Sequence, residues 1–193
     1  LSLQEKEQGA LKLGFDPFCV TPKLYRDLKK ALKNSESKLI PIFSNWIDDV
    51  WKDRPAAPAK EIYFLDEQYT GESVASKLIR VRKVLQAEGV QLLVLSKLDE
   101  IAWLTNLRGS DIAYNPVFES YALVTMDEVT CFCRGGISSA LRKQFEGLVR
   151  FKEYSSYLKD LEGLVAQSKP KVWLDPSSTT MGTLLLIQKQ LGC

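Results

Sequence analysis

Histidine is absent from the 193 residues of this chain, and its absence excludes several kinds of catalytic site. Without an imidazole there is no Ser-His-Asp triad, no Cys-His pair and no HExxH zinc site. The commonest general base near neutral pH is also missing. Asp, Glu, Lys and Tyr remain available for acid–base chemistry, but the chain is a poor candidate for a self-sufficient hydrolase.

The chain is also poor in cysteine, in long apolar runs and in net charge. Its four cysteines are scattered, which favours a reducing compartment over a disulfide scaffold. No apolar run exceeds about four residues, far from the ~20 that cross a bilayer, and the first residues lack a signal-peptide pattern. With 26 basic and 24 acidic residues, no global field attracts a nucleic acid or an anionic membrane. We therefore expect a cytoplasmic protein that binds neither.

Strand and helix patterns alternate along the chain, which is typical of an α/β fold. Hydrophobic residues make up 45% of the sequence, enough for a packed core. Short apolar or alternating runs predict strands over 11–15, 39–43, 90–95, 117–125, 129–133, 149–152 and 172–174. Apolar stripes at helical spacing predict helices over 24–32, 74–85, 99–104, 141–148, 158–165 and 181–191.

Two features suggest a division into domains. Residues 51–60 are rich in proline and alanine and have no periodicity, which predicts a linker. The segments Leu11–Pro17 and Lys171–Pro176 each end a predicted strand in Asp-Pro and precede an amphipathic helix. The simplest account is two domains of similar build, the tail of the first followed by most of the second, with chance as the alternative.

The polar segment after the strand over 90–95 is the first candidate for a site, because ligands of open α/β sheets usually lie at loops beyond strand ends. Arg108 and Asp111 lie three residues apart in it. They either form an ion pair that stabilises the loop, or make a polar wall in which Arg108 clamps a carboxylate or carbonyl. Asp99 and Glu100 diverge on a helix, so a role at the helix start, with Asp99 as cap, is favoured over paired catalysis.

Three other groups have both a structural and a functional interpretation. Cys131 and Cys133 share one face of a strand, but no second pair of soft ligands exists, so buried core cysteines are favoured over a metal site. The four tryptophans are better explained as core and linker anchors than as a platform for stacking bases. The basic face of the helix over 24–32 is favoured as a solvated surface over an anion-binding face.

Several of these segments resemble the three-domain, cytosolic type of Xaa-Pro aminopeptidase, in the creatinase/aminopeptidase P family. The similarity rests on DEIAWLTNLRGSD at 99–111, NPVFESYA at 115–122, IDDVWKDRP at 47–55 and YTG at 69–71. The resemblance implies that residues 1–55 are the C-terminal part of a first creatinase-N-terminal-like domain plus linker. Residues 56–193 would be a second such domain, truncated at its C-terminus. The implied fold is a ribonuclease H-like mixed sheet flanked by helices.

In that family the enzyme is a third domain, the "pita-bread" domain, which holds two divalent metal ions, usually manganese. The resemblance implies that this chain lacks that domain and carries no catalytic residue, metal ligand or cofactor of its own. It implies an accessory region, inactive alone, that shapes the cleft and restricts substrate access. Its partners would be the catalytic domain of the same polypeptide and peptides with a penultimate proline, in a parent that forms homodimers. The residues expected to face the cleft are Arg108, Asp111, Tyr114 and Asn115.

Two rival interpretations remain open from the sequence. The first is a binding module in which the pita-bread domain has lost its metals, as in a histone-chaperone subunit of similar architecture. The sequence downstream of this chain, with or without five metal ligands, separates that module from the peptidase. The second is creatinase, whose motifs match this chain less well.

Overall fold

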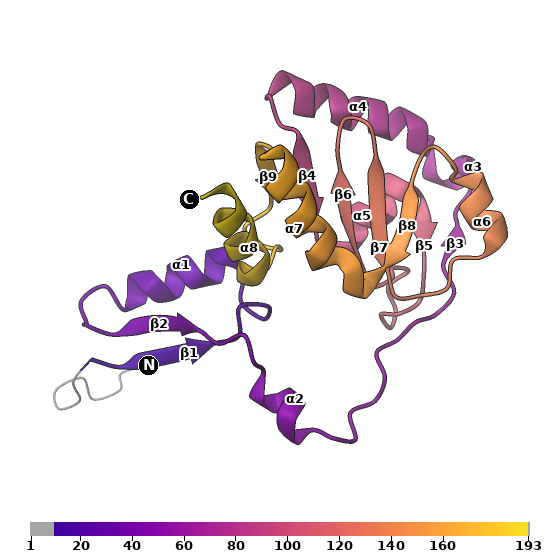
Figure 1. Cartoon of the computed structure of the whole chain (residues 1–193). Helices are drawn as coiled ribbons and strands as arrows, with labels where there is room; N and C mark the ends of the chain where they lie inside the picture. Colours follow the sequence, from indigo (N-terminus) through magenta and orange to yellow (C-terminus); the bar gives the residue numbers. More distant parts are fainter. Residues whose placement is uncertain (1–9, 193) are drawn as a thin grey trace. The chain divides into compact units, whose positions relative to one another are not determined.

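A computed structural model describes residues 10–192, which form two compact units (Figure 1). Among these residues, unit 1 comprises 10–55 together with 176–186. Unit 2 comprises residues 56–175 together with the segment that begins at Ile187. Each unit has its own β-structure: a two-stranded sheet in unit 1, and a five-stranded sheet with a two-stranded ribbon in unit 2.

Unit 1 is built around a β-α-β element. Its elements are β1 (Lys12–Phe15), α1 (Pro22–Ala31), β2 (Lys38–Pro41), α2 (Trp46–Val50) and the first part of α8 (Met181–Leu191). The two strands are parallel, and α1 makes the crossover between them. Thr21 caps α1 by accepting a hydrogen bond from the amide of Leu24 at 3.2 Å, and proline at the first helical position suits the helix start.

The prolines that end the two Asp-Pro segments, Pro17 and Pro176, belong to unit 1 and make reciprocal hydrogen bonds there. The carbonyl oxygen of Pro17 accepts from the amide of Gly182 at 2.7 Å, and that of Pro176 accepts from Lys23 at 2.9 Å. Lys23 follows Pro17 by six positions and Gly182 follows Pro176 by six positions, so each proline carbonyl accepts from the equivalent residue of the other copy. Oγ1 of Thr180 accepts a hydrogen bond from the amide of residue 183 at 3.2 Å. Thr21, before α1, likewise accepts from the amide of the third residue after it. The repeat suggested by the sequence thus has a local structural counterpart.

Unit 2 is a mixed sheet flanked by helices. The sheet order is β8 (Arg150–Glu153), β7 (Val129–Cys133), β6 (Ser120–Val124), β4 (Leu92–Leu95) and β9 (Val172–Leu174). The two outer pairs are parallel and the two inner pairs antiparallel. The helices are α3 (Glu67–Thr70), α4 (Val74–Ala87), α5 (Leu98–Thr105), α6 (Ser139–Gln144) and α7 (Tyr157–Ser168), with a short 3-10 turn at Tyr154–Ser156. The ribbon pairs β3 (Tyr63–Phe64) with β5 (Leu107–Arg108).

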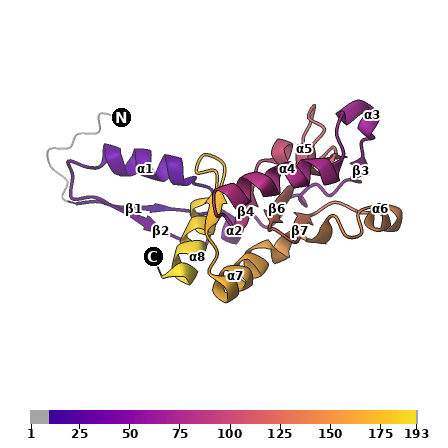
Figure 2. The ribbon, with the colours of Figure 1, turned by 90° about the horizontal axis from the view of Figure 1, so that it is seen from above.

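Alternation along the strands gives the sheet two buried faces. One face packs against α4, α5 and α6 in a core cluster that includes Leu78, Ile101 and Cys131. The other lies under α7, where the ring of Phe132 meets that of Tyr157 at 5.6 Å. Figure 2 shows α4 and α7 on opposite sides of the strands. Burial on both faces explains why all five residues of β7 are buried and why four of them are apolar or cysteine.

The structure confirms the expected mixed sheet flanked by helices and the buried state of both strand cysteines. Two predictions were wrong. The tryptophans do not lie in the core, because Trp46, Trp51, Trp103 and Trp173 are each more than a third exposed. Asp99 does not cap α5, whose N-cap is Lys97; it lies within the first helical turn.

Candidate functional site

The candidate site begins where α5 ends. Asn106 follows the helix in the left-handed conformation, with φ of 53°, which lets the chain turn directly into β5. Asparagine tolerates this region better than most residues. Its carbonyl oxygen accepts from the amide of Leu65 at 2.9 Å, next to the β3–β5 ribbon. The polar segment singled out from the sequence thus begins inside the protein: Asn106 and Leu107 are fully buried, and Arg108 belongs to a strand.

Two cationic side chains hold the last turn of α5. Nζ of Lys77 donates to the carbonyl oxygen of Trp103 at 2.8 Å, and Nη1 of Arg108 donates to that of Ala102 at 2.7 Å. The last four carbonyls of a helix have no partner within the helix and carry its negative dipole end, so cations stabilise them. Arg108 also donates from Nη1 to the carbonyl oxygen of Leu107 at 2.9 Å. The corner between α5 and β5 is therefore fastened by charge-assisted hydrogen bonds.

Lys77 makes its contacts from inside the protein. It is 2% exposed, and Nζ donates a second hydrogen bond to Oδ1 of Asn106 at 2.5 Å. Its ammonium also lies 4.9 Å from the ring centroid of Trp103, within cation–π range. Burial lowers the pKa of Lys77, the charges of Arg108 and Arg80 add to that effect, and Glu72 opposes it. All of its strong contacts are to neutral acceptors.

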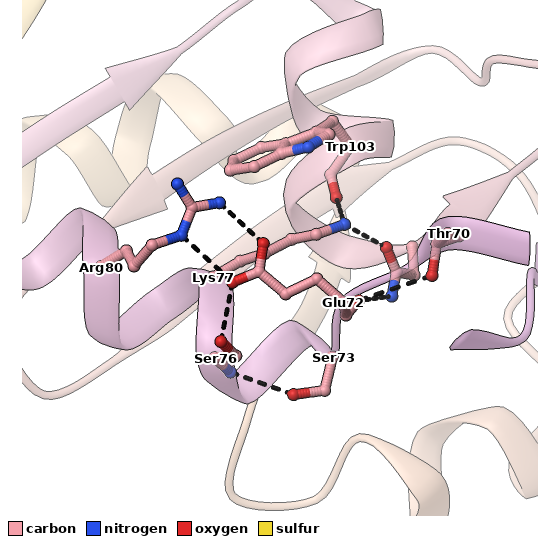
Figure 3. Close-up of polar contacts among 8 residues, drawn as sticks. Thr70, Glu72, Ser73, Ser76, Lys77, Arg80 and Trp103 are labelled. Carbon is pink, nitrogen blue, oxygen red and sulfur yellow. Dashed lines mark hydrogen bonds and ion pairs between the residues drawn. The ribbon is translucent and has the colours of Figure 1, made fainter. Parts of the chain in front are cut away.

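A second layer of contacts ties this amine to the start of α4 (Figure 3). Nδ2 of Asn106 donates to the carbonyl oxygen of Glu72 at 2.9 Å, so the amide links two backbone segments. The carboxylate of Glu72 accepts from Nη2 of Arg80 at 2.7 Å and from the hydroxyl of Ser76 at 2.7 Å. The bonds from Arg80 and Ser76 hold the pKa of Glu72 below its usual value. Ser73, the N-cap of α4, accepts from the amide of Ser76 at 3.1 Å.

Asp111 anchors the loop that follows β5. Its Oδ1 accepts from the amide of Lys60 at 3.0 Å, and its Oδ2 from the amide of Glu119 at 2.9 Å. The carboxylate therefore joins the segment before β3 to the residue before β6. Gly109, two residues earlier, lies so close to Phe118 that an added Cβ would be 2.7 Å from the Cβ of Phe118. This part of the loop has little room to move.

The tip of the loop is a tight turn that exposes an aromatic ring. Tyr114 has a positive φ of 61° and is fully exposed. The amide of Asn115 donates to the carbonyl oxygen of Ile112 at 3.3 Å, and its own carbonyl oxygen accepts from Val117 at 2.8 Å. A positive φ is uncommon for an aromatic residue, and the turn holds this one in it.

The structure places the four predicted site residues on one corner but not in one cluster. The ion pair considered for Arg108 and Asp111 is wrong: Arg108 binds helix carbonyls and Asp111 binds backbone amides. Nε and Nη2 of Arg108 donate to no other group among residues 10–192, so these donors are left for solvent or a ligand. Whether the four residues face a cleft stays a prediction.

Lys77 and Asn106 are the main residues that the sequence interpretation missed. A signal for Lys77 was present, because position 77 lies on the buried side of α4, between Val74 and Leu78. Lysine is rarely buried completely, so a lysine on an apolar stripe indicates a specific partner. The signal for Asn106 was its place directly after an apolar helix, where residues that tolerate the left-handed region are typical.

Two of the alternatives considered from the sequence concern a metal site and an anion-binding face. Among residues 10–192, no three His, Cys, Asp or Glu side chains are placed to hold a metal ion. The same residues contain no helix long and apolar enough to cross a membrane. In unit 1, a groove of about 730 Å³ runs between α1 and β2, and its lining includes Arg26, Lys30 and Lys33 from the basic helix face. These side chains are exposed, as expected of a solvated surface.

Comparison with known proteins gives a consistent set of matches. A family model for the creatinase/prolidase N-terminal domain matches residues 53–191. A probable Xaa-Pro aminopeptidase P of Coprinopsis cinerea is 40% identical over 164 residues, which are 82% of this chain and 26% of that protein. An Xaa-Pro aminopeptidase of Drosophila melanogaster is 35% identical over 179 residues, or 90% of this chain and 29% of that protein.

One solved structure extends the similarity to three dimensions. It is the X-prolyl aminopeptidase of Caenorhabditis elegans, described as a cytosolic enzyme with a di-nuclear active site. The TM-score is 0.81 at 28% identity, over 91% of this chain and 30% of that one. The chain thus spans between about a quarter and a third of the length of the relatives it matches.

Proposed function

Because the chain belongs to the family of creatinase/prolidase N-terminal domains, we propose that it is the non-catalytic accessory region of a longer Xaa-Pro aminopeptidase. The observation that carries the proposal is the pattern of coverage. The Drosophila aminopeptidase matches 90% of this chain with only 29% of its own length, so most of such a protein lies outside the matched region. The absence of histidine agrees with a region that does no chemistry.

The proposed activity of the longer polypeptide is removal of an N-terminal residue that precedes proline. The di-nuclear site of the Caenorhabditis elegans enzyme supports two metal ions in that polypeptide, which we propose to be manganese. The described residues of this chain do not fit a metal ion, so we assign the ligands to the remainder of the polypeptide. By analogy with the same enzyme, we propose a cytoplasmic location, and by family resemblance a homodimeric parent.

Within this role, the corner from Asn106 to Asn115 would form part of the wall of the catalytic cleft. The free donors of Arg108 support the proposal, since a guanidinium fixed through Nη1 presents Nε and Nη2 without further loss of side-chain freedom. Such donors suit a carbonyl or carboxylate oxygen of a peptide. Asp111 would keep the loop in place, and Tyr114 would offer an exposed aromatic surface for contact with the peptide or the catalytic domain.

Hydrolysis of a short Xaa-Pro-Xaa peptide with added manganese tests the assignment. The assay compares this chain with the longer polypeptide of which it is proposed to be a part. We expect activity from the longer polypeptide and none from the chain alone, because the metal ligands are outside it. Activity in neither would refute the peptidase assignment, and activity in the chain alone would refute the accessory role.

A substitution of Arg108 tests the cleft wall in the longer polypeptide. R108Q keeps one pair of N–H donors but removes the charge, and we expect KM to rise about tenfold, which corresponds to the loss of one charge-assisted hydrogen bond. R150Q is the matched control, because Arg150 pairs only with Glu128 on the exposed surface of β8. Equal KM values for R108Q and the unsubstituted protein would remove Arg108 from the cleft.

The rival interpretations gain no support from the comparisons. The relatives reported above are aminopeptidases, and none is a histone-chaperone subunit or a creatinase. The basic and acidic residues are nearly balanced, which does not favour a surface specialised for basic histones.

A further inference from the structure

Lys77 has an unusual environment for a charged side chain. It is 2% exposed, and no carboxylate forms an ion pair with it in the part of the chain that the structure describes. A buried ammonium is costly unless its surroundings compensate, and an apolar side chain of similar volume is often tolerated as well or better. The apolar neighbours Val74 and Leu78 on α4 show that this face of the helix is otherwise an ordinary core surface. Packing alone therefore does not explain the lysine.

The two acceptors of Lys77 lie at the point where the chain leaves α5. One is the carbonyl oxygen of Trp103 and the other is Oδ1 of Asn106. The same amide donates from Nδ2 to the carbonyl oxygen of Glu72. The next turn of the backbone leads to Arg108, whose Nη1 binds the neighbouring carbonyl of Ala102. Lys77 and Arg108 thus bind adjacent carbonyls of one helical turn, and a shift of that turn would move the guanidinium.

We propose that Lys77 is a positioning residue for Arg108. Its ammonium, with the amide of Asn106, fixes the end of α5 and so sets the direction in which Nε and Nη2 of Arg108 are presented to a peptide. The inference rests on the proposed function, because it takes Arg108 as a contact for the substrate. It assigns no contact between Lys77 and the substrate, since Lys77 is enclosed and Trp103 covers it.

A double-substitution cycle in the longer polypeptide tests the proposal. The variants are K77M, R108Q and the pair together, with KM and kcat measured on an Xaa-Pro-Xaa peptide in the presence of manganese. K83M is the matched control, because Lys83 carries the same side chain on the exposed side of α4. Thermal unfolding of each variant establishes that it is folded at the assay temperature.

We expect K77M to raise KM about three- to tenfold with kcat changed less than twofold, since a misplaced guanidinium loses a binding contact and not a chemical group. In the R108Q background the same change should have no further effect on KM, because non-additivity identifies residues that act through one another. K83M should match the unsubstituted protein. If K77M does not fold, N106G takes its place: glycine keeps the left-handed backbone and removes the amide.

The outcomes separate this inference from the proposed function. If R108Q leaves KM unchanged, the cleft-wall proposal fails, and the inference fails with it. If R108Q raises KM but K77M does not, only the positioning role is wrong. If the effects of K77M and R108Q multiply in the double variant, Lys77 acts independently of Arg108, which also overturns the inference.

A second measurement needs no catalysis. Amide hydrogen exchange on this chain should show faster exchange over residues 106–108 in K77M than in K83M. The reason is that K77M removes the two hydrogen bonds from the ammonium that hold the end of α5. Exchange over β7 should be equal in the two variants, which would show that the change is local. Unchanged exchange over 106–108 would contradict the positioning role directly.

Discussion

The ammonium of Lys77 sets two free-energy terms against each other in the folded protein. Desolvation opposes the charged form, whereas the acceptors on Trp103 and Asn106 stabilise it. The net effect is a pKa below the usual value, so the desolvation term is the larger. A lysine whose pKa falls on folding makes stability depend on pH in a defined direction.

We expect the free energy of unfolding to rise with pH in the window between the folded pKa of Lys77 and its unfolded value of about 10.4. Within that window the unfolded state binds more protons, and the penalty for burying the charge is fully present only below the folded pKa. Urea unfolding from pH 7 upward, for the unsubstituted chain and K77M, isolates this contribution in their difference. Tyr121, whose pKa burial raises, acts in the opposite direction above about pH 10 and cancels in the difference. A difference that does not vary with pH would contradict the assignment.

Asp111 allows a prediction about stability. Both of its carboxylate oxygens accept backbone amides, and D111N replaces one acceptor with a donor. One amide then loses its partner, so we expect the free energy of unfolding to fall by about 1–3 kcal/mol. D127N is the control, since Asp127 is exposed in the turn between β6 and β7. Chemical denaturation of both variants measures the effect, and equal stabilities would show that Asp111 does not anchor the loop.

At the scale of elements, α5 and β5 show how a short structure can be fixed by its ends. The helix has only eight residues, and its last turn is held by side chains from α4 and β5. Gly109 then brings the chain against Phe118 before the loop begins. The glycine is required by close approach and not by a special backbone angle.

G109A tests that close approach. An added Cβ would lie 2.7 Å from Cβ of Phe118, so the loop or the start of β6 must move. We expect a loss of about 1–3 kcal/mol in the free energy of unfolding, typical of overpacking at a tight site. G136A is the control, because no atom lies within 4 Å of a Cβ added at Gly136. If calorimetry gave both variants the same Tm, the local fit would be looser than the structure indicates.

Sequence patterns predicted the longer elements and missed the shortest. Helices such as α4 and α7 contain several turns, so their apolar stripes can be recognised in the sequence. The strand cysteines of β7 were correctly expected to be buried. The elements α2, α3, β3 and β5 have two to five residues and show neither periodicity, whereas the equally short β9 was predicted from its unbroken apolar run. Arg108 and Asp111 were singled out as candidate cleft residues, and that role stays a prediction. Their hydrogen-bond partners could not be predicted, because nearly every residue has a backbone carbonyl and amide and the sequence does not identify which of them is in reach.

At the scale of the whole molecule, the apolar core is concentrated in one unit. Among residues 10–192, the buried hydrophobic residues other than proline lie between Ile62 and Ile187, and few of them belong to unit 1. Unit 1 pairs two parallel strands, an arrangement that usually depends on further strands and on cover for both faces. In the proposed longer polypeptide, that cover would come from the rest of a first domain similar to unit 2.

Hydrogen exchange on the chain alone should reveal this difference. We expect amides of β1 and β2 to exchange on the order of 100-fold faster than those of β6 and β7, because local opening of a small unit exposes little apolar surface. In the longer polypeptide the same amides should become protected, while β6 and β7 change little. Equal protection of the two sheets in the chain alone would show that unit 1 is stable without additional structure.

The reciprocal hydrogen bonds of Pro17 and Pro176 have a consequence for how such a repeat persists over evolution. The donors are the amides of Lys23 and Gly182 and the acceptors are proline carbonyls, so no side chain forms either bond. Most side chains around these contacts can therefore change while the contacts themselves are inherited unchanged. Proline is excluded at position 23, because it has no amide hydrogen to donate. At position 182 an added Cβ would lie 2.5 Å from the ring of Phe18, so glycine is favoured there.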